Sequence, residues 1–201
     1  DAARSLHVGS AWELGARVTP LIREPGGALL EALTTLDAGE SWLVAPRVSP
    51  ENPRLWSPGI KLGVKEGSKT HMTELFGPVL AVMRADDLTH AIGIANAVPY
   101  GLTAGIQSLD DRESRLWSES IDAGCLYVNR VTTGAIVRRQ PFGGRLCLGA
   151  RDIGQGHQKF LTPGAGQQVR PAQIVAQPAG HLDQNGIAGS MAPVVIHRFE
   201  Q

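Results

Sequence analysis

Short apolar runs alternate with amphipathic stretches in the middle of the chain, and the alternation predicts a series of strands and helices. Residues 79–83 (VLAVM) form a continuous apolar run, which is typical of a buried strand. Asp86 or Asp87 then offers the N-cap of a helix. One face of that helix would be formed by apolar residues at helical spacing: Leu88, Ala91, Ile92 and Ala95.

The same alternation continues along the chain. Residues 102–108 (LTAGIQS) predict a second strand and residues 126–129 (LYVN) a third, with a helix over residues 112–121 between them. Asp110 and Asp111 would cap that helix, and its apolar face would consist of Leu116, Trp117 and Ile121. Strand, helix, strand, helix, strand is the order of a parallel sheet with covering helices. We therefore predict an α/β fold with a parallel βαβαβ sheet.

The first sixty residues are less regular because Pro and Gly interrupt them repeatedly. Within them, residues 28–36 predict a helix, and residues 42–45 and 60–64 predict two short strands. The chain opens with Asp1 rather than Met, and no signal-peptide pattern follows. We therefore expect the chain to be a fragment.

The character of the chain changes after Gly144, where Gly, Ala, Pro and Gln dominate and periodicity fades. This composition leans towards disorder, although residues 194–196 are apolar enough for a strand. We predict an ordered part over residues 1–144 and a divergent, irregular tail over residues 145–201. Disorder and out-of-frame translation both stay open as explanations of the tail.

Composition excludes several classes of function. A chain of 201 residues suits one ordinary domain, and a formal net charge of zero leaves no field of one sign to attract nucleic acid or an anionic membrane. No apolar run approaches the ~20 residues that cross a bilayer. Cys125 and Cys147 are too few for a disulfide framework, and neither they nor the six histidines have metal-ligand spacing. We predict no metal, no nucleic-acid partner and a cytoplasmic location.

Four segments carry a family resemblance: residues 73–79 (TELFGPV), residues 99–105 (PYGLTAG), Gly124 with Val128-Asn129, and residues 140–144 (QPFGG). In this order and spacing they resemble the aldehyde dehydrogenase superfamily. Residues 5–20 with 56–61, and residues 129–142, are similar to the L-glutamate-γ-semialdehyde (1-pyrroline-5-carboxylate) dehydrogenases, including the C-terminal enzyme unit of bifunctional proline utilisation proteins. The resemblance covers residues 1–144.

The resemblance implies NAD-dependent oxidation of L-glutamate γ-semialdehyde to glutamate, a step of proline catabolism. This chemistry needs a thiolate nucleophile, a hydride acceptor and a general base. In the family, the nucleophile, the base and the oxyanion-binding asparagine lie upstream of a segment like residues 5–22. We therefore assign no catalytic residue to this chain, and expect it to be a partial and inactive piece. Cys125 is interpreted as a small buried side chain.

The resemblance also implies two cofactor-binding residues. Glu74 matches a glutamate that binds the ribose hydroxyls of the nicotinamide half of NAD, and a carboxylate can accept both hydrogen bonds. Phe76 matches a residue that packs near the nicotinamide. The alternatives are a surface glutamate before a turn and an ordinary core phenylalanine. Gly77 and Pro78 would shape the turn into the next strand.

A loop after the third predicted strand carries the implied substrate specificity. Gly134 and Ala135 would donate backbone N–H groups to the carboxylate of the substrate, and Phe142 would pack on its aliphatic part. An ordinary loop between strands is the alternative. The partner is thus a small-molecule aldehyde with an amino-acid head group. A dehydrogenase for another aldehyde, and a non-catalytic fragment or interaction module, stay open as alternative functions.

After residues 142–144 the sequence departs from the family, because Arg145, Leu146 and Cys147 stand where the family has another continuation. In the family that continuation leads to a strand used in oligomer contacts. A homo-oligomer is therefore implied by the resemblance but in doubt for this chain.

Overall fold

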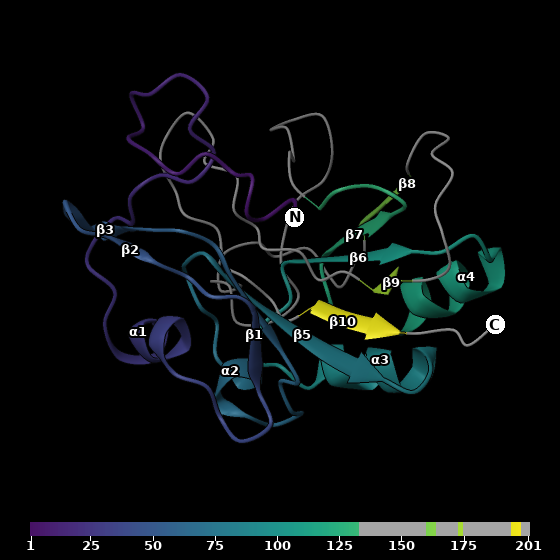
Figure 1. The fold of residues 1–201 in the computed structure, drawn as a ribbon. Coiled ribbons are helices and arrows are strands. Elements are labelled where there is room, and N and C mark those ends of the chain that lie inside the picture. The colour runs from purple at the N-terminus through teal and green to yellow at the C-terminus, as the bar shows by residue number, and fades with distance from the viewer. Residues whose placement is uncertain (133–159, 164–172, 175–193, 198–201) are drawn as a thin grey trace, which may run out of the picture. The chain divides into compact units, whose positions relative to one another are not determined.

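The computed structural model describes residues 1–132, 160–163, 173–174 and 194–197, and the chain divides into two compact units (Figure 1). Unit 1 contains the described residues up to Val82, and unit 2 contains those from Met83 onward. The division falls inside the strand Val79–Ala85, so this strand contributes residues to both units. No helix in the described ranges is both long and apolar enough to cross a membrane.

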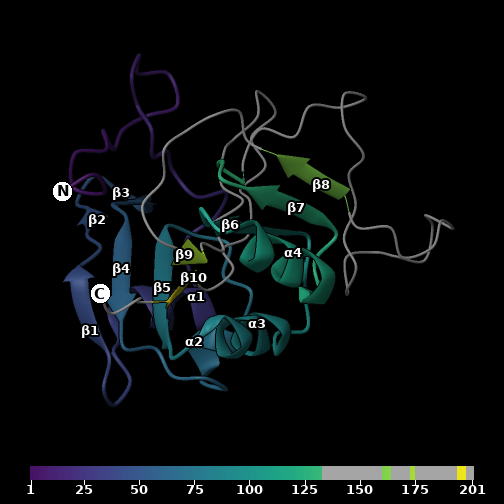
Figure 2. The same cartoon turned by 90° about the vertical axis from the view of Figure 1, so that its right-hand side faces the viewer.

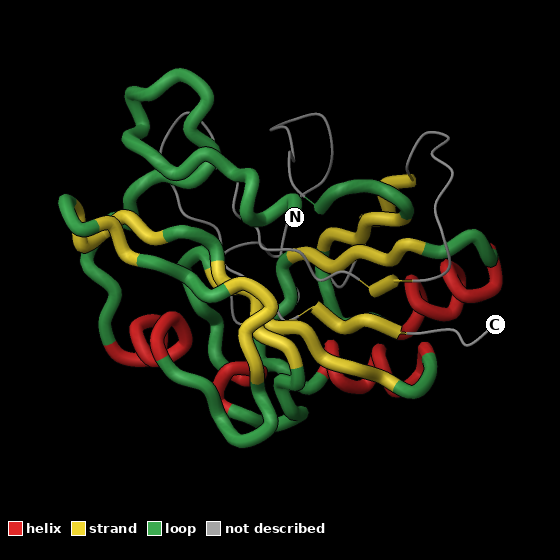
Figure 3. Tube along the Cα trace, in the orientation of Figure 1, coloured by secondary structure: helices red, strands yellow, loops and turns green. Residues whose placement is uncertain are grey.

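Unit 1 begins with a loop segment over residues 1–26 (Figure 3). Within this segment an isolated bridge joins Val8 to Val18. Its elements follow in the order α1 (Gly27–Thr34), β1 (Ser41–Val44), β2 (Val48–Ser49), β3 (Asn52–Trp56), β4 (Gly59–Leu62), α2 (Lys69–Met72) and β5 (Val79–Ala85). β4 is antiparallel to β1 and parallel to β5, with Gly59 opposite Val79. β2 and β3 form a separate antiparallel pair.

The core of unit 1 lies against α1. The buried cluster consists of one face of this helix and three residues from later segments: Ala32, Leu33, Trp56, Leu75 and Val79. The apolar spacing within α1 places its buried residues on one side, as an amphipathic helix requires. Leu75 comes from the segment just before β5. Because burying a leucine side chain contributes about 1.5–3 kcal/mol, Leu75 anchors that segment on the core.

Unit 2 contains α3 (Leu88–Asn96), β6 (Thr103–Gln107), α4 (Asp111–Ser120), β7 (Cys125–Val128), β8 (Phe160–Pro163), β9 (Gln173–Ile174) and β10 (Val194–His197). β6 and β7 are parallel neighbours, with Thr103 opposite Cys125 (Figure 2). β8 pairs with β7 in parallel and β9 with β6 antiparallel, which gives the order β8-β7-β6-β9. Large, fully buried side chains of this unit come from β5, α3, β6, the α4 region and β7: Met83, Ile94, Ile106, Trp117, Ile121, Leu126 and Tyr127.

The predicted α/β class, the order of strands and helices and the parallel pairing are confirmed. The apolar run at residues 194–196 forms β10. The position of β5 differs from the predicted single βαβαβ sheet. β5 pairs with β4 and β10, in the order β1-β4-β5-β10, whereas β6 and β7 belong to the other sheet. An apolar run indicates that a strand is buried on both faces, but it carries no information about the strands that flank it.

Aspartate caps begin both long helices of unit 2, as the sequence predicts. The Asp87 carboxylate accepts a hydrogen bond from the His90 N–H at 2.7 Å, at the start of α3. The Asp110 carboxylate accepts one from the Arg112 N–H at 2.8 Å, at the start of α4. Each carboxylate satisfies an N–H that has no partner within its own helix.

The apolar face of α4 is narrower than predicted. Trp117 and Ile121 are four residues apart and both are buried, whereas Leu116 is 46% exposed. Successive residues of a helix are rotated by about 100°, so Leu116 lies to one side of the line that Trp117 and Ile121 form. The prediction that Leu116 belongs to the buried face is therefore wrong.

Asp87→Ala is expected to lower the free energy of unfolding of the chain by about 1 kcal/mol, because the His90 N–H loses its acceptor. Asp87→Asn retains an oxygen that can accept the same bond, so it is the matched control and should cost much less. Urea titrations followed by circular dichroism would measure both changes. Equal losses in the two variants would show that the cap bond is not what Asp87 contributes.

Candidate functional site

The segment with the two predicted cofactor-binding residues lies between α2 and β5 in unit 1. Leu75 is buried, whereas its neighbours are not: Glu74 is half-buried and Phe76 is 49% exposed. Phe76 is therefore not a core phenylalanine. Two tight turns lead the chain into β5, and each is closed by a backbone hydrogen bond. The Gly77 N–H donates to the Leu75 carbonyl at 3.0 Å, and the Val79 N–H donates to the Gly77 carbonyl at 2.9 Å.

The Glu74 carboxylate takes part in no hydrogen bond or ion pair among the described residues. Both of its oxygens are therefore available as acceptors, each with two lone pairs. The backbone around it is held by the buried Leu75 and by the tight turns that follow, so the carboxylate projects from a fixed segment. This arrangement fits a group that accepts hydroxyl hydrogen bonds from a ligand.

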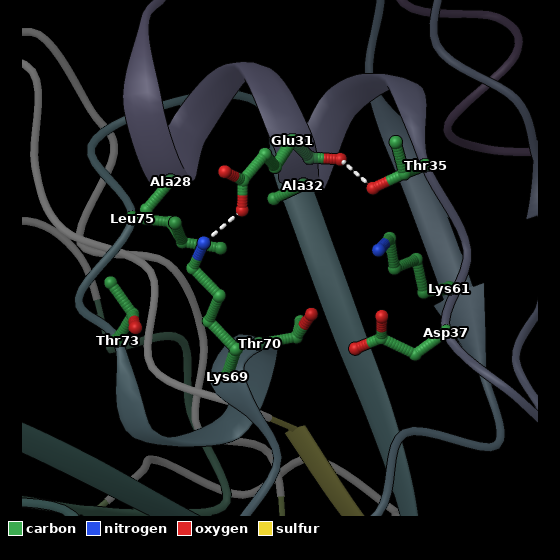
Figure 4. A pocket seen from close by; sticks show the side chains of 10 residues that line it. All are labelled: Ala28, Glu31, Ala32, Thr35, Asp37, Lys61, Lys69, Thr70, Thr73 and Leu75. Carbon is green, nitrogen blue, oxygen red and sulfur yellow. Dashed lines mark hydrogen bonds and ion pairs between the residues drawn. The ribbon is translucent and has the colours of Figure 1, made fainter.

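A small cavity lies beside α1 (Figure 4). Ten residues line it: Ala28, Glu31, Ala32, Thr35, Asp37, Lys61, Lys69, Thr70, Thr73 and Leu75. Glu31 and Lys69 form an ion pair there. The cavity volume of about 30 Å³ is far below the ~300 Å³ at which ligand pockets begin. Thr73 and Leu75 line the cavity but Glu74 does not, so this cavity is not a dinucleotide site.

A buried ion pair joins β4 to the loop before β1. Lys61 Nζ lies 2.9 Å from Glu40 Oε2, and the two side chains are 2% and 1% exposed. The same oxygen accepts the Asp37 N–H at 3.0 Å, and the Lys61 ammonium lies 5.3 Å from the centre of the Trp42 ring. Glu40 Oε1 is buried and has no hydrogen-bond partner among the described residues. The hydrophobic pattern does not reveal this pair, because a charged residue usually indicates a surface position.

The chain after β7 leads towards the predicted substrate loop. The Arg130 guanidinium lies 5.4 Å from the centre of the Tyr127 ring. Thr132 is 4% exposed, and its buried hydroxyl has no hydrogen-bond partner in the part of the chain that the structure describes. Gly134, Ala135 and Phe142 lie outside the described residues, so their binding role stays a prediction.

Among the described residues, a large pKa change occurs at a helix cap. Hydrogen bonds from the Arg112 side chain, and then from its backbone N–H, lower the pKa of Asp110 to about 2, and the carboxylate in turn raises the pKa of Arg112. The guanidinium lies 2.7 Å from the carboxylate at the surface of α4. This pair stabilises the start of a helix, and nothing in its geometry suits proton transfer to a ligand.

Cys125 is 2% exposed at the start of β7, which confirms its interpretation as a small buried side chain. Within the described ranges, no three His, Cys, Asp or Glu side chains gather as a metal site. The described residues thus offer groups that can bind, but no accessible sulfur nucleophile.

Comparison with known proteins identifies a family. The sequence model of the "Aldehyde dehydrogenase family" matches residues 1–157, which extends past Gly144. A curated relative, the 1-pyrroline-5-carboxylate dehydrogenase of Bacillus cytotoxicus, is 32% identical over 145 residues, which are 72% of this chain and 28% of the relative. The chain therefore spans less than a third of the length of that relative.

Solved structures give the same result. Proline Utilization A (PutA) from Corynebacterium freiburgense is 50% identical, with a TM-score of 0.69, over 71% of this chain and 15% of that protein. The 1-pyrroline-5-carboxylate dehydrogenase from Thermus with bound NAD is 31% identical, with a TM-score of 0.62, over 72% of this chain and 28% of that enzyme.

Proposed function

Because the chain belongs to the aldehyde dehydrogenase family, we propose that it is part of the catalytic domain of an enzyme that oxidises L-glutamate γ-semialdehyde to glutamate with NAD. The similarity to 1-pyrroline-5-carboxylate dehydrogenases supports this substrate, and the NAD-bound Thermus relative supports this cofactor. In this proposal, residues 1–144 belong to the catalytic domain and residues 145–201 form a divergent tail.

The observation that carries the proposal is the state of Glu74. Its carboxylate is half-buried, its backbone is fixed by Leu75 and the following turns, and neither oxygen has a partner among the described residues. Two oxygens on one rigid segment can accept hydrogen bonds from two neighbouring ribose hydroxyls. Phe76, which is half-exposed beside Glu74, would offer its ring to the nicotinamide end of NAD.

NAD, when bound, would accept the hydride that the aldehyde carbon loses on oxidation. The residues described in this chain would bind and orient NAD and the aldehyde, while the thiolate and the general base would come from other parts of such an enzyme. Glu74 would hold the nicotinamide ribose, because a charged acceptor forms stronger hydrogen bonds than a neutral one. No proton-transfer step is assigned to it.

The substrate head would be held by the chain that follows Thr132. Backbone N–H groups of Gly134 and Ala135 would bind the carboxylate of the semialdehyde, and Phe142 would pack on its carbon chain. Thr132, at the start of this loop, is buried.

The proposed activity is tested in a chimera in which residues 1–157 replace the matching segment of the Bacillus cytotoxicus relative. We expect NAD-dependent oxidation of L-glutamate γ-semialdehyde, detected as NADH absorbance, and no oxidation by the 201-residue chain alone. A chimera that oxidises simple aliphatic aldehydes as well as the semialdehyde would contradict the proposed substrate.

In the same chimera, Glu74→Gln is expected to raise the KM for NAD about tenfold, because it removes the negative charge from an acceptor of two hydroxyl bonds. The KM for the aldehyde should stay within about twofold, since Glu74 is assigned to the cofactor alone. Glu51→Gln, at an exposed glutamate of the same unit, is the matched control. An unchanged KM for NAD, or an equal rise for both substrates, would remove the role given to Glu74.

A further inference from the structure

The segment between α2 and β5 is fixed at both of its ends by backbone hydrogen bonds. Its first residue, Thr73, donates its N–H to the Lys69 carbonyl at 3.1 Å and so ends α2. Near the other end, the Pro78 carbonyl accepts from the Gly59 N–H at 2.8 Å, which joins the segment to β4. The position of residues 74–77 therefore depends on what they pack against.

Helix α1 supports this segment from one side. Leu75 belongs to the same buried cluster as Ala32 and Leu33 of the helix. Leu29, also in α1, packs against that cluster and comes close to Gly77. A Cβ atom at Gly77 would lie only 2.5 Å from the Leu29 Cδ1 atom. Two positions of the segment, 75 and 77, thus lie against α1.

The two residues assigned to the cofactor alternate with these positions along the chain. Glu74 is half-buried and Phe76 is 49% exposed, whereas Leu75 between them is 5% exposed. The segment therefore has residues that are held by α1 and residues that a ligand can reach. Because the peptide units that join them are planar and stiff, a displacement of the held residues also displaces Glu74 and Phe76.

The packing between α1 and the segment is loose at one place and tight at another. Leu75 lines the cavity of about 30 Å³ beside α1, so the segment is not close-packed on the helix there (Figure 4). The Glu31–Lys69 ion pair joins α1 to α2, but both side chains are more than half exposed, and such pairs contribute little. At Gly77, by contrast, Leu29 leaves no room for one more carbon atom. The contact at Gly77 therefore sets the distance between helix and segment.

Space, rather than backbone conformation, explains a glycine at position 77. The φ angle of Gly77 is not positive, so the backbone itself does not require glycine. The three nearest atoms that a Cβ would meet all belong to the Leu29 side chain: Cδ1 at 2.5 Å, Cδ2 at 3.0 Å and Cγ at 3.3 Å. Leu29→Ala removes all three atoms. A cycle of the two single variants and the double variant therefore isolates this contact.

We propose that Leu29 and Gly77 are positioning residues for the cofactor: their contact sets how far the segment lies from α1, and so places the Glu74 carboxylate and the Phe76 ring for the nicotinamide half of NAD. This inference rests on the proposed function, because it takes Glu74 as the residue that holds the ribose hydroxyls. Hydrogen bonds weaken steeply as their angle falls, and a displacement of about 1 Å can reduce a rate a hundredfold.

The same helix contains a matched control. Leu30 is the next residue after Leu29 in α1, and its side chain is exposed. Leu30→Ala deletes the same atoms from the same helix without acting on Gly77. An effect that comes from shortening a leucine anywhere in α1 would therefore appear in both variants, whereas an effect of the contact would appear only at Leu29.

Hydrogen exchange on the 201-residue chain tests the contact itself. The Val79 amide reports on the turn, because it donates to the Gly77 carbonyl at 2.9 Å. Gly77→Ala should speed exchange of this amide about tenfold, but by less than about twofold when it is added to Leu29→Ala. In either background, Gly77→Ala should leave the Ser57 amide, which donates to the Arg47 carbonyl, within about twofold.

Three results of the exchange experiment would overturn the inference. The Val79 amide could be unaffected by Gly77→Ala, which would show that the segment does not depend on this contact. It could be accelerated equally in both backgrounds, which would show that Leu29 is not the cause. The Ser57 amide could be accelerated as much as Val79, which would show that the contact holds the whole unit rather than the segment.

Kinetics of the chimera test the consequence for NAD. Gly77→Ala should raise the KM for NAD about tenfold and leave the KM for the semialdehyde within about twofold. Added to Leu29→Ala, it should raise the KM for NAD by less than about twofold, and Leu30→Ala should leave both KM values within about twofold. An unchanged KM for NAD in Gly77→Ala, an equal rise for both substrates, or an equal rise in both backgrounds would overturn the positioning role.

The Glu74→Gln variant separates this inference from the function on which it rests. If Glu74→Gln raises the KM for NAD but Gly77→Ala does not, the positioning role fails and the proposed function stands. If Glu74→Gln leaves the KM for NAD unchanged, the cofactor role of Glu74 fails, and exchange of the Val79 amide still decides whether the contact holds the segment.

Discussion

Lys61→Met is expected to lower the free energy of unfolding of the chain by about 3–5 kcal/mol, because it leaves the Glu40 carboxylate buried without its countercharge. The Glu40 side chain is 1% exposed, and one of its oxygens already has no hydrogen-bond partner within the described ranges. Methionine fills most of the volume of lysine, so the loss would come from the uncompensated charge rather than from a cavity. Urea unfolding followed by tryptophan fluorescence would measure it.

Two further variants identify the cause. Lys69→Met removes the cation of the Glu31–Lys69 pair, in which both side chains are more than half exposed, and should cost less than about 1 kcal/mol. The double variant Lys61→Met with Glu40→Leu removes both buried charges and should recover most of the lost stability. If the double variant is as unstable as Lys61→Met alone, packing rather than charge explains the loss.

Gly101→Ala is expected to destabilise unit 2 by about 1–3 kcal/mol, because there is no space for a side chain where α3 leads into β6. A Cβ at this position would lie 2.2 Å from the Asp122 carbonyl oxygen, a backbone atom that cannot rotate away. The close approach is held by the Gly124 N–H, which donates to the Gly101 carbonyl at 3.0 Å. Thermal unfolding of the variant would show the loss.

Gly93→Ala is the matched control for Gly101→Ala. Gly93 lies on the exposed side of α3, and a Cβ there would meet nothing within 4 Å. Alanine should therefore stabilise the helix by about 0.5–1 kcal/mol, since glycine is the more flexible residue in the unfolded chain. A destabilising Gly93→Ala, or a neutral Gly101→Ala, would show that the space for a Cβ atom does not determine the effect of alanine at these two positions.

Local sequence signals predict the elements of unit 2 well. Asp87 and Asp110 mark the starts of α3 and α4 because a cap acts within three residues of its own position. The β2–β3 pair is absent from the prediction because Pro53 lies inside β3, and a proline argues against a strand unless the strand is at an edge. α2 is a single turn, too short to show a period.

Contacts between distant residues could not be predicted in this way. The Glu40–Lys61 pair joins residues 21 positions apart, and the Asn129 side chain accepts a hydrogen bond from the Ser108 N–H, 21 positions earlier in the chain. The spacing of polar residues along the sequence does not indicate such contacts between distant residues. The segment around Glu74 shows the opposite case. Resemblance to a family indicated this segment, and the structure adds that its backbone is held by tight turns and that the Glu74 carboxylate has no partner among the described residues.

The burial of Cys125 has a practical consequence. A maleimide or iodoacetamide reacts with a thiolate only when water can reach the sulfur, and this sulfur is enclosed between the neighbours of β7. Alkylation at Cys125 would therefore occur only when β7 separates from its surroundings. The mass of the peptide that contains Cys125, followed over time, would report how often the interior of unit 2 opens.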